Sequence, residues 1–324
     1  RASGRRILQA QEIQLDGAVN DTLLLGFSSL LDRLVADQNL LFQRRNLDFY
    51  RKMVEEAEVK FQNGLGSELD LKQSRMRRQL AENRVRENEL AVAEADRQIG
   101  LLLASNTWDS SLASMPTGPL ASLVPASFSS ESLLVVSEQI RPSLQMLKLQ
   151  EIAGNEELAA AREKARPEVG TSFRWGRQGR ATDPGLAREM RDRSWDLTVE
   201  YQTTIGERPE SLEFKRQKAR LKAIGEQLQQ AREETRKVIS DRLERIDFLR
   251  QSLRDFQLSR DLAGEVLEGQ QMHFQLGKVS LLDLIRYQSD FEEACLSVIR
   301  AEANLVLAWM QVLRESGQLA ALFR

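Results

Sequence analysis

The sequence predicts a mainly α-helical protein, built from long antiparallel helical hairpins with a small pair of β-strands inserted between them. Glycine and proline are scarce (18 and 7 of 324 residues), and the prolines fall between Pro116 and Pro209. The stretches on either side are rich in strong helix formers such as Ala, Leu, Glu, Gln, Lys and Arg. One eleven-residue segment occurs twice, and two short segments alternate between apolar and polar residues, as strands do.

The internal repeat is the most informative feature. Residues 61–71 read FQNGLGSELDL and residues 274–284 read FQLGKVSLLDL, so seven of eleven positions match without a gap. The same spacing of 213 positions also pairs Leu8 with Leu221 and Thr22 with Thr235. The duplication therefore covers a whole helix pair and not the turn alone.

Each copy contains the same signals for a helix reversal. We expect the incoming helix to end at Gly64 in the first copy and at Gly277 in the second, because glycine suits the left-handed position after a helix. Ser67 and Ser280 are placed to cap the following helices. The chain should then run back antiparallel to the helix it has just left.

The repeat sets the expected domain boundaries. Residues 1–106 form the first helical repeat, residues 107–130 form a linker rich in Ser and Pro, and residues 131–324 form the second repeat. The incoming helices should span about 7–62 and 209–274, and the second would be roughly 100 Å long. Helices of this length bury their apolar stripe by packing side by side.

Strands are expected only in the second repeat. A helix should run from about Glu131 to Ala165 and stop before Pro167. Two strands follow, at about 167–178 and 194–206, each with apolar residues on one face. The apolar positions are Val169, Thr171, Phe173 and Trp175 in the first strand, and Trp195, Leu197, Val199 and Tyr201 in the second.

Each strand has about the length of a tilted membrane-spanning strand. If the two pair, Trp175 and Trp195 lie at the same height beside the connecting loop, and Tyr201 lies near the opposite end. Together with Phe173 they are candidates for a membrane girdle. An ordinary half-buried hairpin is the alternative. Two strands cannot close a barrel, so the membrane interpretation requires other chains or further strands.

The sequence offers no chemistry typical of an enzyme. His273 is the only histidine and Cys295 the only cysteine, so one chain holds no histidine cluster and no disulfide. The usual cofactor and nucleophile motifs do not occur, and a net charge of -2 gives no basic face for nucleic acid. We therefore expect no catalytic, cofactor or metal site. His273 and Cys295 are interpreted as structural residues.

These features resemble the TolC-like outer-membrane efflux protein family over essentially the full length of the chain. The resemblance rests on the two Phe-x-x-Gly-x-x-Ser-x-Leu-Asp-Leu turns and on four short motifs. These are IRPSL at 140–144, ARPEV at 165–169, IGERP at 205–209 and GQL at 317–319.

The resemblance implies a homotrimer whose strands close one outer-membrane β-barrel, while its helices continue as an α-barrel, a tunnel across the periplasm of a Gram-negative bacterium. It implies a periplasmic adaptor and an inner-membrane pump as partners, outer-membrane lipid around the strands, and a role in export. Multidrug export, metal export and type I protein secretion all remain open, because a tunnel selects by diameter and wall charge.

Two departures from the family stand out. The family has four strands per subunit, two in each repeat, and this chain shows only the second pair. We therefore expect further residues ahead of Arg1. The other departure lies at the periplasmic mouth, which the family narrows with an aromatic residue, an arginine and two acidic residues. The matching positions are Phe274, Val279, Asp283 and Arg286. Of the two acidic positions only the first is kept, and the second carries the opposite charge.

Two interpretations of Asp283 stay open. Three copies around an axis would form a carboxylate ring that attracts cations, although Arg286 could pair with Asp283 one turn along. Alternatively, Asp283 is a first-turn charge that favours a helix N-terminus. For Asp70, its counterpart in the first copy, we favour the structural interpretation but keep it among the candidate entrance residues.

The turns themselves resemble the tips on which the family's adaptors dock, and helix reversal is their simpler role. The candidate docking residues are Asn63, Gly64, Leu65, Gly66 and Ser67 in the first turn, and Gly277, Lys278, Val279 and Ser280 in the second. Two other classes of protein compete with a channel. One is a periplasmic adaptor, which should carry one hairpin between lipoyl-like β segments, and the other is a soluble coiled-coil scaffold.

Overall fold

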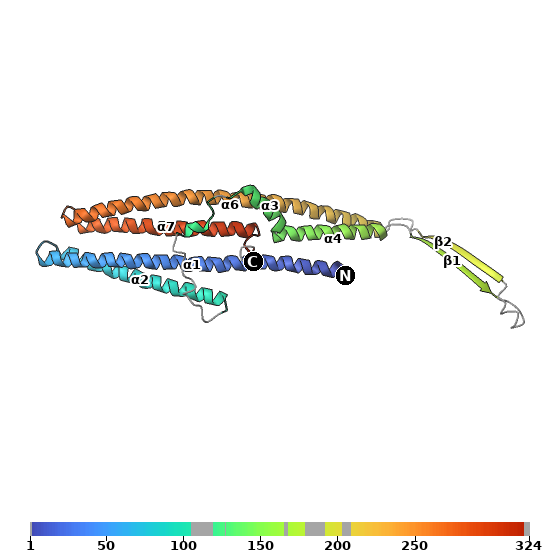
Figure 1. Ribbon diagram of the computed structural model, residues 1–324, viewed down its shortest axis with the longest axis horizontal. Helices are drawn as coiled ribbons and strands as arrows, with labels where there is room; N and C mark the ends of the chain where they lie inside the picture. Colours follow the sequence, from blue (N-terminus) through green and yellow to red (C-terminus); the bar gives the residue numbers. More distant parts are fainter. Residues whose placement is uncertain are drawn as a thin grey trace. The chain divides into compact units, whose positions relative to one another are not determined.

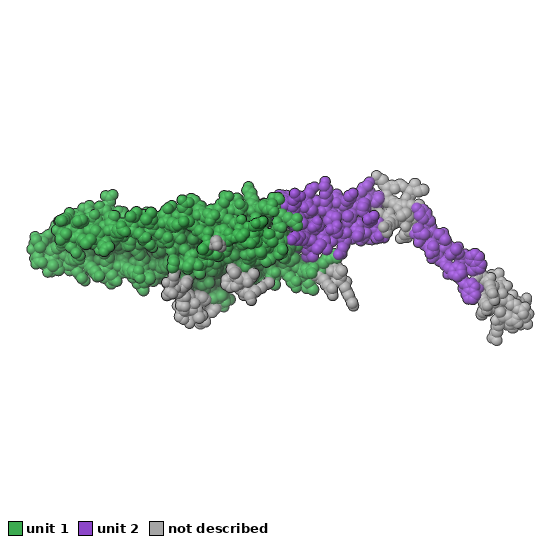
Figure 2. Space-filling model, turned by 45° about the horizontal axis from the view of Figure 1, so that its top comes forward, with its two compact units in different colours: residues 1–145, 232–324 green, residues 146–231 purple. Residues whose placement is uncertain are grey.

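The computed structural model divides the chain into two compact units, coloured separately in Figure 2. Unit 1 comprises residues 1–145 and 232–324, and unit 2 comprises residues 146–231. The structure describes residues 2–104, 119–126, 128–164, 168–178, 192–202 and 209–320.

Two long helical hairpins dominate the fold (Figure 1). The first consists of α1 (Ala2–Gln62) and α2 (Glu68–Leu102), and the second of α6 (Pro209–Gln275) and α7 (Leu281–Glu315). Helix α6 runs through both units, and α1 packs on α2 and on α7 within unit 1. The helical hairpins predicted from the repeat are thus confirmed.

The core of unit 1 joins the two copies. One cluster, built around Ile246, Leu305 and Val312, includes Trp309, whose ring stacks on Phe128 at 5.3 Å. A second cluster, here called the turn-side core, lies nearer the turns. It contains Leu40, Leu47, Tyr50, Met53, Ala81, Val85, Leu267, Phe274, Leu281, Leu284 and Ile285. Burying each large apolar side chain contributes about 1.5–3 kcal/mol, so these clusters hold the hairpins side by side.

Helix α7 supplies residues to both clusters. Among the described helices it alone has the length and composition that could cross a membrane, but half of its most apolar window is buried inside the protein. It also carries two buried carboxylates, Glu292 and Glu302. These features are those of a core helix, which explains its apolar composition without a membrane.

The helix predicted from about Glu131 to Ala165 is broken. Helix α3 spans Ser130–Ile140 and α4 spans Pro142–Lys164, with Arg141 extended between them at φ -58°, ψ 121°. Pro142 has no N–H to continue the helix, and its ring disfavours the α conformation at the residue before it. The sequence expectation of one continuous helix was wrong at this residue.

Part of the expected linker is packed. A short 3₁₀ helix, η2 (Leu120–Leu123), places Leu120 in the core with no exposed surface. The Leu120 backbone N–H donates to the buried Glu302 carboxylate of α7 at 3.2 Å. Residues 107–118 and residue 127 of the predicted linker lie outside the described residues.

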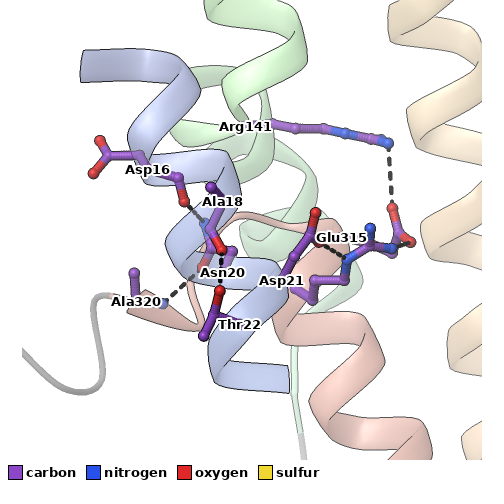
Figure 3. Close-up of polar contacts among 9 residues, drawn as sticks. Asp16, Ala18, Asn20, Asp21, Thr22, Arg141, Glu315 and Ala320 are labelled. Carbon is purple, nitrogen blue, oxygen red and sulfur yellow. Dashed lines mark hydrogen bonds and ion pairs between the residues drawn. The ribbon is translucent and has the colours of Figure 1, made fainter. Parts of the chain in front are cut away.

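A polar junction fixes the first copy to the end of α7 (Figure 3). Three contacts make it: the Ala320 N–H donates to Asn20 Oδ1 at 2.8 Å, Arg314 Nε lies 2.7 Å from Asp21 Oδ1, and Arg141 Nη2 lies 3.2 Å from Glu315 Oε2. The hydrogen bond from Arg314 to Asp21 is the main reason that the pKa of Arg314 is raised. The junction brings together α1, α7 and the break between α3 and α4.

Unit 2 contains the strand pair, in which β1 (Glu168–Gln178) and β2 (Asp192–Gln202) run antiparallel. Trp175 lies directly opposite Trp195, as the alternation predicts, and Val169 lies opposite Tyr201 near the other end. The connecting residues 179–191 and the last part of the second expected strand, 203–206, fall outside the described residues.

Candidate functional site

The two turns between paired helices form the candidate site, because the sequence repeats their residues most faithfully. They lie at the same end of unit 1 (Figure 1), where Lys60 of α1 touches Phe274 of α6. Gly64 and Gly277 have φ values of 72° and 70°, the left-handed conformation predicted for them.

Both turns use the same hydrogen bonds. Each glycine N–H donates three residues back, and the next residue donates five residues back, which is the Schellman arrangement. These bonds are Gly64 to Phe61 and Leu65 to Lys60 in the first turn, and Gly277 to Phe274 and Lys278 to His273 in the second, all 2.8–3.0 Å. The repeated glycines therefore end the two incoming helices in the same way.

The serines cap the outgoing helices as predicted. The Ser67 side chain accepts from the N–H groups of Leu69 and Asp70 at 3.0 and 3.3 Å. The Ser280 side chain accepts from the Asp283 N–H at 3.2 Å. Each bond satisfies a backbone donor that the first helical turn leaves without a partner.

The two repeated aspartates take part in these caps. Asp70 Oδ2 accepts from the Ser67 N–H at 3.4 Å, and Asp283 Oδ2 accepts from the Ser280 hydroxyl at 2.6 Å. Asp283 and Arg286 are both exposed, and within the described residues no ion pair joins them. The caps support the structural interpretation of both aspartates, while the exposure of Asp283 leaves its carboxylate accessible to solvent.

The two repeated phenylalanines differ in their surroundings. Phe274 belongs to the turn-side core with only 7% of its surface exposed, whereas Phe61 is 42% exposed. Lys60 Nζ lies 3.7 Å from the centre of the Phe274 ring and 3.4 Å from the Phe274 carbonyl oxygen. Sequence reasoning missed Lys60, although its counterpart in the repeat is His273, another side chain that can carry positive charge.

The tips of both turns expose large apolar side chains. Leu65 is 81% exposed and Leu276 is 68% exposed, and Leu69 and Leu282 on the outgoing helices are similarly open. The other candidate docking residues are exposed, except Gly66 and Val279, which are half-buried. Apolar side chains that protrude at a polar surface are typical of contact sites for other proteins.

A buried polar layer connects the copies farther along the helices. The Tyr50 hydroxyl donates to Glu292 Oε1 at 3.0 Å, and Arg84 Nη1 lies 2.7 Å from Glu292 Oε2. Burial, reinforced by the charge of Glu292, raises the pKa of Tyr50. Residues 242 positions apart meet here, and no local sequence signal could have paired them.

The described residues contain no group of His, Cys, Asp and Glu side chains suited to a metal ion. Cys295 is a free, half-buried thiol in α7. Burial raises its pKa to about 11, so little reactive thiolate forms at neutral pH. His273 is exposed beside the second turn.

The predicted girdle residues lie on one face of the strand pair. Trp175 and Trp195 are paired near the loop end, and Tyr201 is near the other end. Phe173 lies at the middle of the ladder opposite Leu197, so it shares the apolar face without marking either end. All four of these aromatic side chains are exposed in the single chain.

No protein-family model matches the chain, and no curated protein sequence is significantly similar to it. Solved structures do match. The open-state MtrE outer-membrane channel of Neisseria gonorrhoeae aligns with a TM-score of 0.67 at 14% identity, covering 96% of this chain and 69% of that one. The chain has the fold of the TolC-like outer-membrane channels.

Two further structures of this fold agree. The Campylobacter jejuni CmeC outer-membrane channel aligns with a TM-score of 0.63 at 15% identity over 97% of this chain and 66% of its own. The Vibrio cholerae outer-membrane protein VceC aligns with a TM-score of 0.61 at 14% identity over 97% and 75%. The resemblance inferred from the repeated turns is thus confirmed at the level of the fold.

Proposed function

We propose that this chain is a subunit of a trimeric outer-membrane export channel, which conducts cargo received from a pump and adaptor across the periplasm and the outer membrane. The observation that carries the proposal is the pair of duplicated helical hairpins joined to a strand pair. Nearly the whole chain aligns with solved outer-membrane channels in this arrangement. The proposed role is a passive conduit and requires no catalytic residue.

The strand pair supports a place in the membrane. The face formed by Val169, Phe173, Trp175 and their partners on β2 is apolar and exposed. The opposite face carries Ser172, Arg174, Asp196, Thr198 and Glu200. Alternation of this kind fits lipid on one side and water on the other. A two-stranded sheet has open edges that must be paired in a membrane, which calls for strands from other subunits.

Exposed apolar side chains on the helices support the assembly. Large apolar patches that stay exposed on a chain mark surfaces that contact other proteins or a membrane. On α6 the exposed large apolar residues are Leu212, Phe248, Phe256, Leu258, Leu262, Val266 and Met272. Packing against neighbouring subunits would bury them.

At the tips, we propose that the first-turn residues Asn63–Ser67 and the second-turn residues 277–280 contact the adaptor, and that Phe274, Asp283, Arg286 and Asp70 shape the entrance. Leucines that protrude at both tips support docking. Bulky substitutions at Gly64 or Gly277 should weaken adaptor binding, and normal efflux by well-folded variants would contradict tip-to-tip docking. Asp283→Asn channels should lose their preference for cations. An unchanged preference would exclude a ring of Asp283 carboxylates at the entrance.

The two competing functions fit less well. An adaptor should have one helical hairpin flanked by lipoyl-like β segments, whereas this chain has two homologous hairpins and a bare strand pair. A soluble scaffold leaves the exposed apolar face of the strands without a partner.

The mass and detergent dependence of the intact native protein distinguish these three functions. A channel should require detergent for solubility and elute with the mass of a trimer after correction for bound detergent. An adaptor or scaffold should remain soluble when detergent is removed. A soluble, detergent-independent protein would contradict the proposal.

A further inference from the structure

The contact between Lys60 and Phe274 is one half of a duplicated pair. Lys60 is the residue before Phe61, and the repeat places His273 before Phe274 at the same spacing of 213 positions. Within the chain, Lys60 of the first copy lies over the Phe274 ring of the second. The corresponding pair, His273 of the second copy with Phe61 of the first, is not formed, and both of these side chains are exposed.

The same asymmetry extends along the incoming helices. Gln43 and Met53 of α1 are buried, while their counterparts on α6, Phe256 and Val266, are 42% and 46% exposed. The duplicated chain therefore has one face of α1 covered and the corresponding face of α6 open.

The outgoing helices show the complementary pattern. Gln288 and Glu292 of α7 are buried, and Gln288 Nε2 donates to Asn46 Oδ1 of α1 at 2.7 Å. Their counterparts on α2, Arg75 and Gln79, are exposed. One copy-to-copy interface is thus complete inside the chain, and the two surfaces of a second such interface remain open.

We propose that this second interface forms between subunits and that His273 of one subunit lies over the Phe61 ring of the next. The occupant of the open α6 face is a second copy of this chain. A head-to-tail contact joins two different surfaces. Copies joined in this way form a closed ring when the rotation from one subunit to the next permits it, and repeated use of one interface geometry supplies that rotation. The inference rests on the trimer of the proposed function and assigns residues to its subunit seam.

The two kinds of contact differ in strength. A lysine ammonium carries full positive charge at neutral pH and is attracted to the face of an aromatic ring. A histidine at the same position has no ammonium group to place over the ring. The contact at the seam should therefore be the weaker of the two, and we expect the entrance to open along the seam.

Cross-linking tests the assignment directly in the intact protein with Cys295→Ser. Phe61→Cys with His273→Cys should give covalent dimers and trimers with a short thiol-specific cross-linker. The matched control, Lys60→Cys with Phe274→Cys, should cross-link only within one chain. A trimeric protein whose Phe61→Cys/His273→Cys variant forms no intersubunit cross-links would overturn the inference while leaving the proposed function standing. A protein that is not a trimer would overturn both.

Channel conductance provides a second test. It uses no cysteine variants, so misfolding of those variants cannot affect its result. His273→Lys installs the first copy's cation in the seam and should lower the open probability by roughly two- to fivefold, in keeping with the modest strength of an exposed cation–π contact. The same substitution together with Phe61→Ala should have no such effect. If His273→Lys lowers opening equally with or without the Phe61 ring, the pairing is wrong.

Discussion

The two turns of this protein have the same backbone conformation, but their side chains have different surroundings. Both end a helix with a left-handed glycine and begin the next with a serine cap, and both keep a buried leucine, Leu71 or Leu284. The phenylalanine before the glycine is buried in the second copy and exposed in the first. Local sequence thus determines the reversal, and the neighbouring helices determine which side chains are covered.

The same lesson applies away from the turns. Glu89 and Glu302 occupy equivalent positions in the repeat. Glu89 is exposed and pairs with Arg44, whereas Glu302 is buried and accepts a hydrogen bond from Leu120 of the connecting segment. Duplication supplied two similar hairpins, and packing then gave their identical residues different environments.

The largest expected difference between the copies concerns the phenylalanines. Phe274→Ala should lower the free energy of unfolding by about 3–5 kcal/mol, the usual cost of removing a buried aromatic ring. Phe61→Ala should cost much less in the unfolding of the subunit, because the ring is already partly exposed. Denaturant unfolding of the two variants in detergent measures both costs. Equal losses would show that the copies are equivalent at this position.

The glycines should behave alike. Gly64→Ala and Gly277→Ala should each cost about 1–2 kcal/mol, because an L-residue in the left-handed region is strained. An added Cβ meets no atom within 4 Å at either site, so the cost comes from the backbone alone. Thermal unfolding of both variants checks this prediction. A much larger loss at one turn would break the backbone equivalence.

The serine caps should differ slightly. Ser67→Ala and Ser280→Ala should each cost about 1 kcal/mol. The loss should be somewhat greater at Ser67, whose side chain accepts two backbone hydrogen bonds instead of one. Paired unfolding measurements test the order, and a reversed order would assign more strength to the hydrogen bond between Ser280 and Asp283.

The smallest effect is pH-dependent. Burial is the main reason that the pKa of Glu302 is raised, and the Leu120 N–H partly opposes it. The native state therefore holds its proton to higher pH than the unfolded state, and stability falls as pH rises from the unfolded pKa of about 4.3 through the folded pKa. Glu302→Gln should therefore raise the melting temperature above this range and have less effect below it.

Glu89→Gln provides the matched control for this prediction. Its carboxylate is exposed and forms a surface ion pair, so the substitution should change stability by less than about 1 kcal/mol. A melting temperature that responds to pH in the same way in both variants would contradict the difference in burial.

Much of this fold could be predicted because its signals are local. Gly64 and Gly277 fixed the helix ends, Ser67 and Ser280 fixed the caps, and the period-two alternation placed Trp175 opposite Trp195. Pro142 was also a local signal, and its break in the helix was overlooked. The contacts of Lys60 with Phe274 and of Tyr50 with Glu292 could not be found in this way, because each joins residues more than 200 positions apart.

The candidate entrance was harder to predict for the same reason. The sequence placed Phe274 and Asp283 beside a turn, but it could not show that Phe274 is covered by α1 or that Asp283 is engaged by Ser280. The repeat places Phe61 and Phe274 at equivalent positions. Only the packing of the helices separates them.

Single-channel recording on the intact native protein in planar lipid bilayers tests the central claim most directly. A trimeric tunnel whose membrane barrel is formed by the strands of its subunits should give discrete conductance steps in salt solution. These steps should need no added substrate and no energy source. A purified trimer that binds the bilayer but passes no current under any voltage would contradict the account.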